Sequence, residues 1–483
     1  MSRFDVAVLT LYYLTLGSLA IYSVHRLYLV RLRRKFTGAL ESSAAVDVAQ
    51  IRWPAMTVQL PLFNEPNVAG RLIDAVAAIE YPGTMDIQVL DDSTDETSAI
   101  VAERVAAWRA RGTRIEHIRR TSRAGYKAGA LAHGMALSGS ELFAVFDADF
   151  VPPSDIFRAM VPRFADAGVG MVQARWGHLN RSRTLLTRVQ AIFLDGHFAV
   201  ESAGRFLSGR FFNFNGTAGI WRRQAIEDAG GWSASTLTED LDLSYRAQLA
   251  GWKFVFLPSI EVPAELPATL SGFQEQQHRW AKGSIQTARK ILPRLLAGDL
   301  PLRIKIEAFF HLTNNAAYLL TLLVALLMVP AIVIRQRLGL TWSLLVDLAL
   351  FLASTVSVLL FYVEGQRLAG RRTPTPRELL TVLPVGIAMS IPNAAAVIEG
   401  LFETGGHFRR TPKRGAAASE PYDRPPRLPL GEMLMAAFFI AATGSFIAAR
   451  QWMSIPFLTL FLSGYALGTV KALRERLRFR HAR

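Results

Sequence analysis

Apolar residues are gathered toward the two ends of the chain, with a more polar stretch between them. The segment Val6–Val24 is nearly uncharged and long enough to span a bilayer. Beyond Ile306 the chain again becomes strongly apolar. The hydrophobic runs of this second region predict further membrane-spanning helices at Ala308–Ile334, Leu340–Val363, Gly431–Ala449 and Trp452–Val470.

The charges around the first apolar segment predict its orientation. Only Arg3 precedes it, whereas the basic run Arg31–Lys35 follows it, which is the reverse of a secretory signal. Because positive charges stay on the cytoplasmic side of a membrane, we expect an uncleaved anchor whose C-terminal side is cytoplasmic. Five crossings then place the polar stretch and the basic tail from Lys471 onward on the cytoplasmic side as well.

One further apolar segment, Leu379–Phe402, has two interpretations. It is long enough to cross a membrane, but Pro384, Pro392 and Asn393 interrupt it. Basic residues flank it on both sides, which favours a re-entrant or interfacial segment over a crossing.

The polar stretch from Ile51 to about Leu300 has the pattern of an α/β domain, in which predicted strands alternate with helices. Such an order predicts a parallel sheet with ligands bound beyond the carboxyl ends of its strands. The sequence contains neither GxGxxG nor GxxxxGK(S/T), so a dinucleotide fingerprint and a P-loop are excluded. The predicted strands are Met56–Leu62, Asp86–Leu90, Arg114–Ile118 and Glu141–Phe146. One predicted helix begins at Pro66, a second ends at Trp108, and a third covers Tyr126–Leu137.

Composition narrows the possible chemistry. The 483 residues include no cysteine, which excludes disulfide frameworks, thiolate zinc sites, iron–sulfur clusters and a cysteine nucleophile. The formal net charge of +15 fits either a nucleic-acid surface or cytoplasmic loops beside membrane helices. The basic clusters border the apolar segments, so we expect them to orient the chain in a membrane and predict no nucleic-acid partner. They lie at Arg31–Lys35, Arg371–Arg377, Arg409–Arg414 and Arg474–Arg483.

Acidic residues follow two of the predicted strands. Asp147 and Asp149 are two residues apart, so their carboxylates point to the same side, where they suit Mg²⁺ or Mn²⁺ carrying a diphosphate. The alternative is a solvated acidic loop. Asp91 and Asp92 follow the second strand and would equally serve as an N-cap pair for the next helix. Lys127, beside small residues, is either a surface lysine or a phosphate contact.

Two later motifs also carry candidate chemistry. Thr238-Glu239-Asp240 opens a predicted helix, where its acids either cap the helix or supply a general base for a sugar hydroxyl. Gln276, Arg279 and Trp280 are spaced i, i+3 and i+4, so they share one helical face. Trp280 either packs at the membrane interface or stacks on a sugar ring, while Arg279 is suited to neutralise a leaving phosphate.

The order of these motifs resembles that of the family 2 inverting glycosyltransferases, in the membrane-embedded cellulose synthase-like branch. The resemblance covers about Pro61–Lys290 and rests on Asp91-Asp92, Asp147-Ala148-Asp149, Thr238-Glu239-Asp240 and the QxxRW motif Gln276–Trp280. Further stretches are similar to plant cellulose synthase-like A and C enzymes, which make mannan and glucan backbones: Gln173–Trp176, Phe214–Gly219, Ala229–Trp232 and Glu265–Thr269.

The resemblance implies an α/β GT-A-type (Rossmann-like) cytoplasmic domain plus an α-helical transmembrane region. The expected divisions are an N-terminal transmembrane anchor at 1–35, the glycosyltransferase domain at 51–270, interfacial helices carrying QxxRW at 271–305, transmembrane helices with the re-entrant or interfacial segment at 306–403, a cytoplasmic gating-like loop at 404–430, and a transmembrane hairpin with a basic cytoplasmic tail at 431–483.

The resemblance also implies a role for each site residue. Asp240 is the expected catalytic base, and Asp149 with Asp147 is the expected metal site for Mg²⁺ or Mn²⁺. The segment Phe408–Lys413 resembles a gating loop, with Arg410 in place of the usual valine, and Phe408, Thr411 and Lys413 are its expected gating residues. The expected acceptor-binding residues are Trp280, Gln276 and Glu239, and the expected donor-binding residues are Pro61, Glu65, Asp91, Asp92, Lys127, Asp147 and Arg279.

The leading hypothesis is therefore a processive synthase in the plasma (inner) membrane that polymerises a β-linked glycan, with β-1,4 linkage expected, from UDP-glucose or GDP-mannose. Its expected partners are the nucleotide-sugar donor, a glycan or lipid acceptor and membrane lipids. Asn314, Asn315 and Asp347 are candidate channel-lining residues, because polar groups in membrane spans rarely lack a role. Two alternatives stay open: a transferase adding one sugar to ceramide or diacylglycerol, and a transporter or scaffold with an inactive transferase domain.

Overall fold

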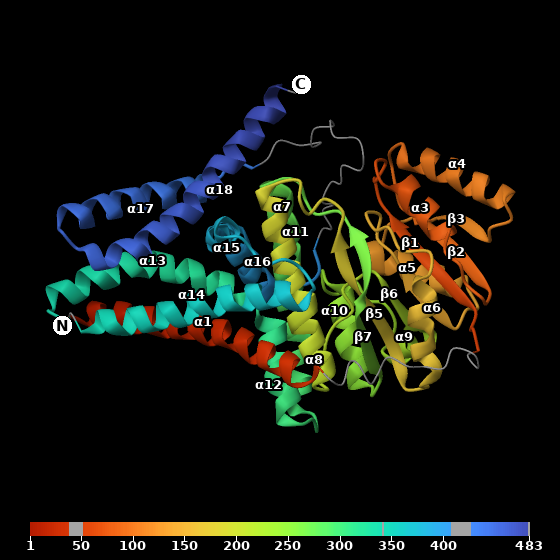
Figure 1. The fold of residues 1–483 in the computed structure, drawn as a ribbon, viewed down its shortest axis with the longest axis horizontal. Helices are drawn as coiled ribbons and strands as arrows, with labels where there is room; N and C mark the ends of the chain where they lie inside the picture. Colours follow the sequence, from red (N-terminus) through yellow and green to blue (C-terminus); the bar gives the residue numbers. More distant parts are fainter. Residues whose placement is uncertain (38–51, 341, 407–426, 482–483) are drawn as a thin grey trace.

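The computed structural model describes residues 1–37, 52–340, 342–406 and 427–481. Figure 1 shows a helix-covered sheet at one end of the molecule and a bundle of long helices at the other. Two helices, α7 (Leu185–Gly196) and α11 (Leu270–Ala297), stand between these parts. The predicted gating residues Phe408, Thr411 and Lys413 lie outside the described residues.

The first half of the sheet follows the predicted alternation of strands and helices. Its strands pair in the order β3-β2-β1-β4, and each neighbouring pair is parallel. The register places Leu62 opposite Asp91, so the carboxyl ends of β1 and β2 meet at one edge. The elements are β1 (Met56–Leu62), α3 (Ala69–Ala77), β2 (Met85–Asp91), α4 (Thr97–Ala110), β3 (Ile115–Arg119), α5 (Tyr126–Ala136) and β4 (Leu142–Val145).

The second half of the sheet corrects the expected all-parallel arrangement. β5 and β7 are parallel to each other, but β6 runs antiparallel to both β4 and β5, so the seven-stranded sheet is mixed. The sequence pattern did not indicate β6 because a four-residue strand is too short to show a period. The elements are α6 (Ile156–Met160), the 3₁₀ helix η2 (Val161–Ala165), β5 (Val169–His178), the π-helix η3 (His197–Ser202), α8 (Ala203–Leu207), β6 (Gly219–Arg222), α9 (Arg223–Asp228), α10 (Glu239–Leu249) and β7 (Lys253–Ala264).

Apolar side chains cover both faces of the sheet. Alternate residues of β1, including Val58 and Leu60, pack with α3, α4 and α6 into one buried cluster. On the other face Phe143 and Trp221 pack with α5 and α9 into a second cluster. A strand directs successive side chains to opposite faces, so the apolar clusters cover both faces of the sheet. Polar groups therefore gather at the strand ends.

Among the described residues, five helices are long and apolar enough to cross a membrane. They correspond to the predicted spans except at Ala308–Ile334, where the chain breaks at Asn314 and Asn315 instead of continuing as one helix. The five helices are α1 (Arg3–Lys35), α13 (Ala316–Arg337), α14 (Ser343–Leu368), α17 (Leu430–Ala448) and α18 (Ile455–His481), with α12 (Leu302–Thr313) preceding the break and the 3₁₀ helix η4 (Trp452–Ser454) preceding α18.

The ambiguous segment forms two helices, α15 (Pro376–Ala388) and α16 (Ser390–Phe402), bent by 45° at their junction. Such a pair is either a broken span or a re-entrant loop. Both alternatives from the sequence therefore remain, and the bend falls before Pro392 because proline removes a helical hydrogen-bond donor.

Candidate active site

A cavity of about 190 Å³ lies at the carboxyl ends of β1, β2 and β4, with residues of α10 and α11 on its other side. All but one of the predicted site residues that the structure describes line it. Segments far apart in the sequence meet here because the parallel strands end at one edge. The lining residues from the predicted set are Pro61, Glu65, Asp92, Lys127, Asp147, Asp149, Glu239, Asp240, Gln276, Arg279 and Trp280.

The exception is Asp91, which is 1% exposed and does not line the cavity. Its carboxylate accepts hydrogen bonds from Ser98 Oγ (2.6 Å), the Ser93 backbone N–H (2.9 Å) and His117 Nε2 (2.9 Å). Burial alone would raise the pKa of Asp91, but these hydrogen bonds outweigh burial and hold that pKa well below its usual range. Asp91 thus holds the loop after β2 in place.

The neighbouring Asp92 does line the cavity, close to an aromatic and basic pair that the sequence analysis did not single out. Arg120 donates to both Asp92 carboxylate oxygens, at 3.0 and 2.5 Å. The Arg123 guanidinium lies 3.2 Å from the centre of the Phe63 ring, and both side chains line the cavity. A planar cation stacked on a ring offers a flat surface of the kind that a nucleobase packs against.

Lys127 joins the acidic groups of the cavity. Its Nζ lies 2.5 Å from Asp147 Oδ1 and 4.0 Å from Glu239 Oε1, and it donates to the Gly216 carbonyl oxygen at 2.8 Å. Burial alone would lower the pKa of Lys127, but the negative charges of Asp147 and Glu239 raise it. The lysine is therefore a cation held inside the cavity, and the surface-lysine interpretation is wrong.

Asp240 and Glu239 lie at the first turn of α10, where Asp240 Oδ1 accepts from the Leu241 backbone N–H at 2.8 Å. Thr238 makes no side-chain cap bond, so helix capping accounts for only part of this motif. Burial and the adjacent charge of Glu239 raise the pKa of Asp240 to about 7. A carboxyl with a pKa near neutrality is suited to take up a proton during a reaction.

The loop before β6 approaches Asp240 closely at Gly216. This glycine has φ +80°, and a β-carbon there would lie 2.9 Å from Asp240 Oδ2. The next residue, Thr217, accepts a hydrogen bond from the Asp147 backbone N–H at 2.9 Å. The stretch Phe214–Gly219 therefore contacts both the Asp147–Asp149 motif and the Thr238–Asp240 motif. The family resemblance included this stretch but gave it no role.

The carboxylates available to bind a metal ion are those of Asp147 and Asp149, which both line the cavity. No group of three or more His, Asp and Glu side chains within reach of one ion occurs in the part of the chain that the structure describes. Two hard carboxylate ligands fit a divalent cation whose other ligands are diphosphate oxygens and water, as Mg²⁺ commonly binds. The residues present thus fit the predicted Mg²⁺ or Mn²⁺.

A second cavity, of about 420 Å³, extends from the first toward the helical bundle. The two cavities share Asp240, Gln276 and Trp280 as lining residues, together with Trp176 and Asn215, which had no predicted role. The ring centres of Trp176 and Trp280 lie 6.3 Å apart at an angle of 56°. Two indole faces at the junction fit a sugar passing between the cavities.

The far part of the second cavity reaches α1, α13, α14 and α15, and polar side chains line it among a larger number of apolar ones. Asn314 and Asn315 are among them, as the channel hypothesis requires, and Asn315 donates to Ser284 Oγ at 2.8 Å. Asp347 is not among them. Its carboxylate pairs with Arg335 in the bundle, away from the cavity, so its assignment as a channel-lining residue is wrong.

The helix that carries QxxRW, α11, is held by residues distant in sequence. Glu475 of α18 accepts from the backbone N–H groups of Leu270 (2.7 Å) and Ser271 (3.1 Å), which are free donors at a helix N-terminus. Further along α11, a β-carbon at Gly283 would lie 2.6 Å from the Thr238 side chain. These contacts set α11 against the Thr238–Asp240 segment, and no local pattern in the sequence indicated Glu475.

The mixed sheet, the acidic cavity at its strand ends and the long apolar helices define the class: a GT-A-type glycosyltransferase domain joined to a helical transmembrane region. Comparison with known proteins agrees. The model of the family described as glycosyltransferase like family 2 matches residues 54–283. A solved mannosyltransferase from Pyrobaculum calidifontis, in complex with GDP-Man and Mn²⁺, shares the fold with a TM-score of 0.54 and 19% identity, covering 82% of this chain and 99% of its own.

Two plant relatives are more similar in sequence. A glucomannan 4-beta-mannosyltransferase 1 of Cyamopsis tetragonoloba is 35% identical over 365 residues, which is 73% of this chain and 66% of that relative, just under two thirds of its length. A probable glucomannan 4-beta-mannosyltransferase 3 of Oryza sativa subsp. japonica is 33% identical over 421 residues, covering 82% of this chain and 74% of that relative. The chain belongs to the family 2 glycosyltransferases, in the cellulose synthase-like branch.

Proposed function

We propose that this membrane protein is a processive inverting glycosyltransferase that extends a β-1,4-linked mannan or glucan from GDP-mannose or UDP-glucose. The observation that carries the proposal is the wall shared by the two cavities. Asp240 and Trp280 line both, so a sugar acceptor entering from the membrane side reaches the base and the donor site at one point. Because the plant relatives are mannosyltransferases by name, we choose GDP-mannose as the first donor to test.

The donor cavity separates the parts of a nucleotide sugar. Phe63, Arg123 and Asp92 offer a stacking surface and a carboxylate to the nucleoside, and Pro61 and Glu65 line the same end. Lys127 and Arg279 supply positive charge for the diphosphate. A divalent cation held by Asp147 and Asp149 would neutralise the diphosphate charge that develops as the bond breaks.

The transfer is a single displacement. The Asp240 carboxylate takes the proton of the acceptor hydroxyl as that oxygen forms a bond to the anomeric carbon. The bond from this carbon to the diphosphate oxygen breaks on the opposite side, and the electron pair leaves with the nucleoside diphosphate. Attack opposite the leaving group inverts the anomeric carbon, so an α-linked donor gives a β-linked product. Arg279 stabilises the departing negative charge.

The second cavity provides the route by which the product leaves the site. Trp176 and Trp280 face its entrance, and Asn314, Asn315 and Tyr318 offer hydrogen-bonding groups further along. Basic residues end α1 and surround the start of α15, so we place the transferase domain on the cytoplasmic side of the plasma membrane. The polymer would then enter the membrane bundle as it grows.

The proposal is tested with the purified full-length chain, radiolabelled GDP-mannose or UDP-glucose, and Mn²⁺. We expect insoluble polymer that a β-mannanase or β-glucanase digests to labelled oligosaccharides. Linkage analysis of the product from each donor identifies the sugar. If the label appears only in a chloroform-soluble lipid carrying one sugar, the chain is a glycolipid-forming transferase instead. Failure to bind either nucleotide diphosphate in a calorimetric titration would leave the scaffold alternative standing.

A further inference from the structure

A second polar cluster lies away from the active site, where the transferase domain meets the bundle. It surrounds a cavity of about 300 Å³ whose lining includes Arg181, Arg188, Arg372 and Glu378. Arg188 belongs to α7, Glu378 to the first turns of α15, and Arg372 to the segment that follows α14. Because α14 is one of the five apolar helices, the cavity sits at the end of a membrane span.

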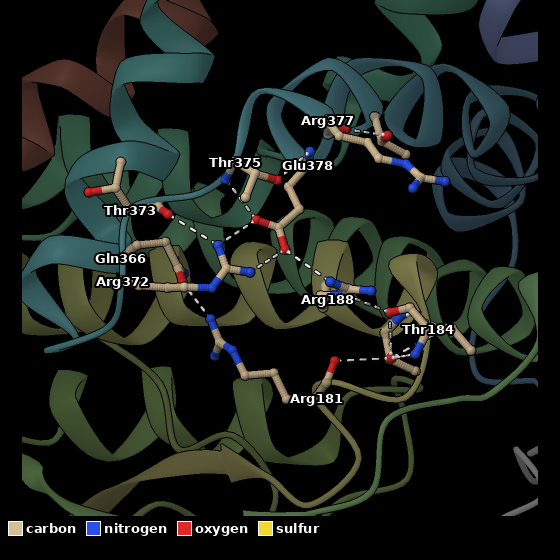
Figure 2. Close-up of polar contacts among 11 residues, drawn as sticks. Arg181, Thr184, Arg188, Gln366, Arg372, Thr373, Thr375, Arg377 and Glu378 are labelled. Atoms are coloured by element: carbon tan, nitrogen blue, oxygen red, sulfur yellow. Dashed lines mark hydrogen bonds and ion pairs between the residues drawn. The ribbon is translucent and has the colours of Figure 1, made fainter.

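Positive charge exceeds negative charge in this cavity. Arg372 donates two hydrogen bonds to the Glu378 carboxylate, at 2.9 and 2.5 Å, whereas Arg188 Nη1 lies 3.9 Å from it, beyond hydrogen-bond distance. Figure 2 shows the two guanidinium groups on different sides of the one carboxylate. Arg181 is already paired with the buried Asp195, at 2.5 Å. The shared carboxylate therefore leaves one guanidinium charge unmatched.

A neighbouring pair repeats this excess. Arg371, next to Arg372, and the buried Arg175 both lie 2.6 Å from the single carboxylate of Glu261. Arg371 Nε and Arg175 Nη1 are buried and have no hydrogen-bond partner within the described residues. Two adjacent sites thus each hold two guanidinium groups on one carboxylate, a composition that attracts a further anion.

The surroundings indicate which anion fits. A guanidinium fork matches the oxygens of a phosphate, and basic pockets beside membrane helices suit phospholipid headgroups. Helix α15, which carries Glu378, also presents an exposed apolar side chain, Leu380, which is 76% exposed. We propose that the cavity lined by Arg188 and Arg372 binds the phosphate of an anionic phospholipid headgroup. The site is independent of the donor pocket and of the reaction proposed above.

The test uses the detergent-solubilised full-length chain, stripped of lipid and titrated with phosphatidylglycerol, with bound lipid counted by native mass spectrometry. We expect one tightly bound phosphatidylglycerol, with phosphatidylcholine bound more weakly. Arg188→Gln should weaken phosphatidylglycerol binding about tenfold, as the loss of charge-assisted hydrogen bonds predicts. Arg188→Lys keeps the charge but not the fork, so its affinity for phosphatidylglycerol should lie between those of the unchanged protein and Arg188→Gln. The matched control is Arg377→Gln, because the Arg377 guanidinium points away from Glu378 in Figure 2 and does not line the cavity.

Equal weakening by Arg377→Gln and Arg188→Gln would overturn the proposal, because it would show diffuse surface attraction. Unchanged binding in Arg188→Gln would also overturn it. In a separate arm, inorganic phosphate is added at the lipid concentration. Displacement of phosphatidylglycerol by phosphate alone would show a site for free phosphate rather than lipid. Unchanged unfolding temperatures of both glutamine variants establish that folding is not the cause.

Discussion

Two aspartates near the strand ends, the fully buried Asp91 and the half-buried Asp240, differ in what surrounds their carboxylates. Asp91 is enclosed by hydrogen-bond donors, which lower its pKa. Asp240 lies beside Glu239 and the backbone of Gly216, and its pKa is raised to about 7. One carboxylate is therefore charged at neutral pH and bound to its own loop, while the other has a pKa that favours proton exchange. Burial alone does not identify a catalytic acid or base; its hydrogen-bond partners do.

The largest expected effect comes from Asp240→Asn, which removes the proposed base. We expect the rate of sugar transfer to fall by about 10² to 10⁴, the usual contribution of a positioned general base. Donor binding measured by calorimetry should persist, because Lys127 and Arg279 remain. Substantial residual transfer would show that Asp240 is not the base.

A smaller loss is expected from Gly216→Ala. The new β-carbon would lie 2.9 Å from Asp240 Oδ2, so it displaces the carboxylate, and a misplaced catalytic group costs about 10² in rate. The control is Gly209→Ala, because Gly209 also has a positive φ but has nothing within 4 Å of a β-carbon. If both variants lose the same activity, backbone strain rather than the close approach explains the result.

Asp91→Asn should lower stability rather than catalysis. Weakening hydrogen bonds to a buried charged group costs about 1 to 3 kcal/mol in the free energy of unfolding. Because the folded pKa of Asp91 lies below its unfolded value, this stabilisation is present at neutral pH and is lost as the pH falls below about 4. Unfolding in denaturant at neutral pH and at a pH below about 4 measures this loss of stability. A transfer rate per folded molecule that falls as far as in Asp240→Asn would contradict the comparison.

The smallest effect concerns the pH profile. The proposed base Asp240 can accept a proton only when it is ionised, so kcat/KM should rise with pH and level off above about 7. The charge of Glu239 contributes to the raised pKa, so Glu239→Gln should move the inflection to lower pH, by about one unit. An inflection that stays in place, or moves upward, would rule out Glu239 as a cause of the raised pKa.

The sequence predicted the first four strands to within one residue at each end, because their apolar residues and turn signals are local. It also identified most of the charged residues that line the cavity, because acidic motifs after parallel strands meet at one edge of the sheet. Asp91 looked the same as Asp92 in the sequence. Only the fold brings His117 and Ser98 to it and turns it away from the cavity.

Other features depended on contacts between distant segments. Asp347 looked like a polar channel residue until the fold paired it with Arg335. The apolar run across Asn314 and Asn315 looked like one span, but the chain breaks there, beside Ser284 of α11. Likewise, the capping of α11 by Glu475 joins residues about two hundred positions apart. Such pairings leave no periodic signal in either segment.

The central claim is that donor site and membrane-side cavity form one path for a growing polymer. Ser354 of α14 lines the second cavity, so Ser354→Trp should fill part of it. The matched control is Ser445→Trp, at an exposed serine of α17 that is not among the residues lining this cavity. The measurement is the length distribution of labelled polymer by gel filtration. The account predicts short products from Ser354→Trp and full-length polymer from Ser445→Trp, whereas full-length polymer from both would contradict it.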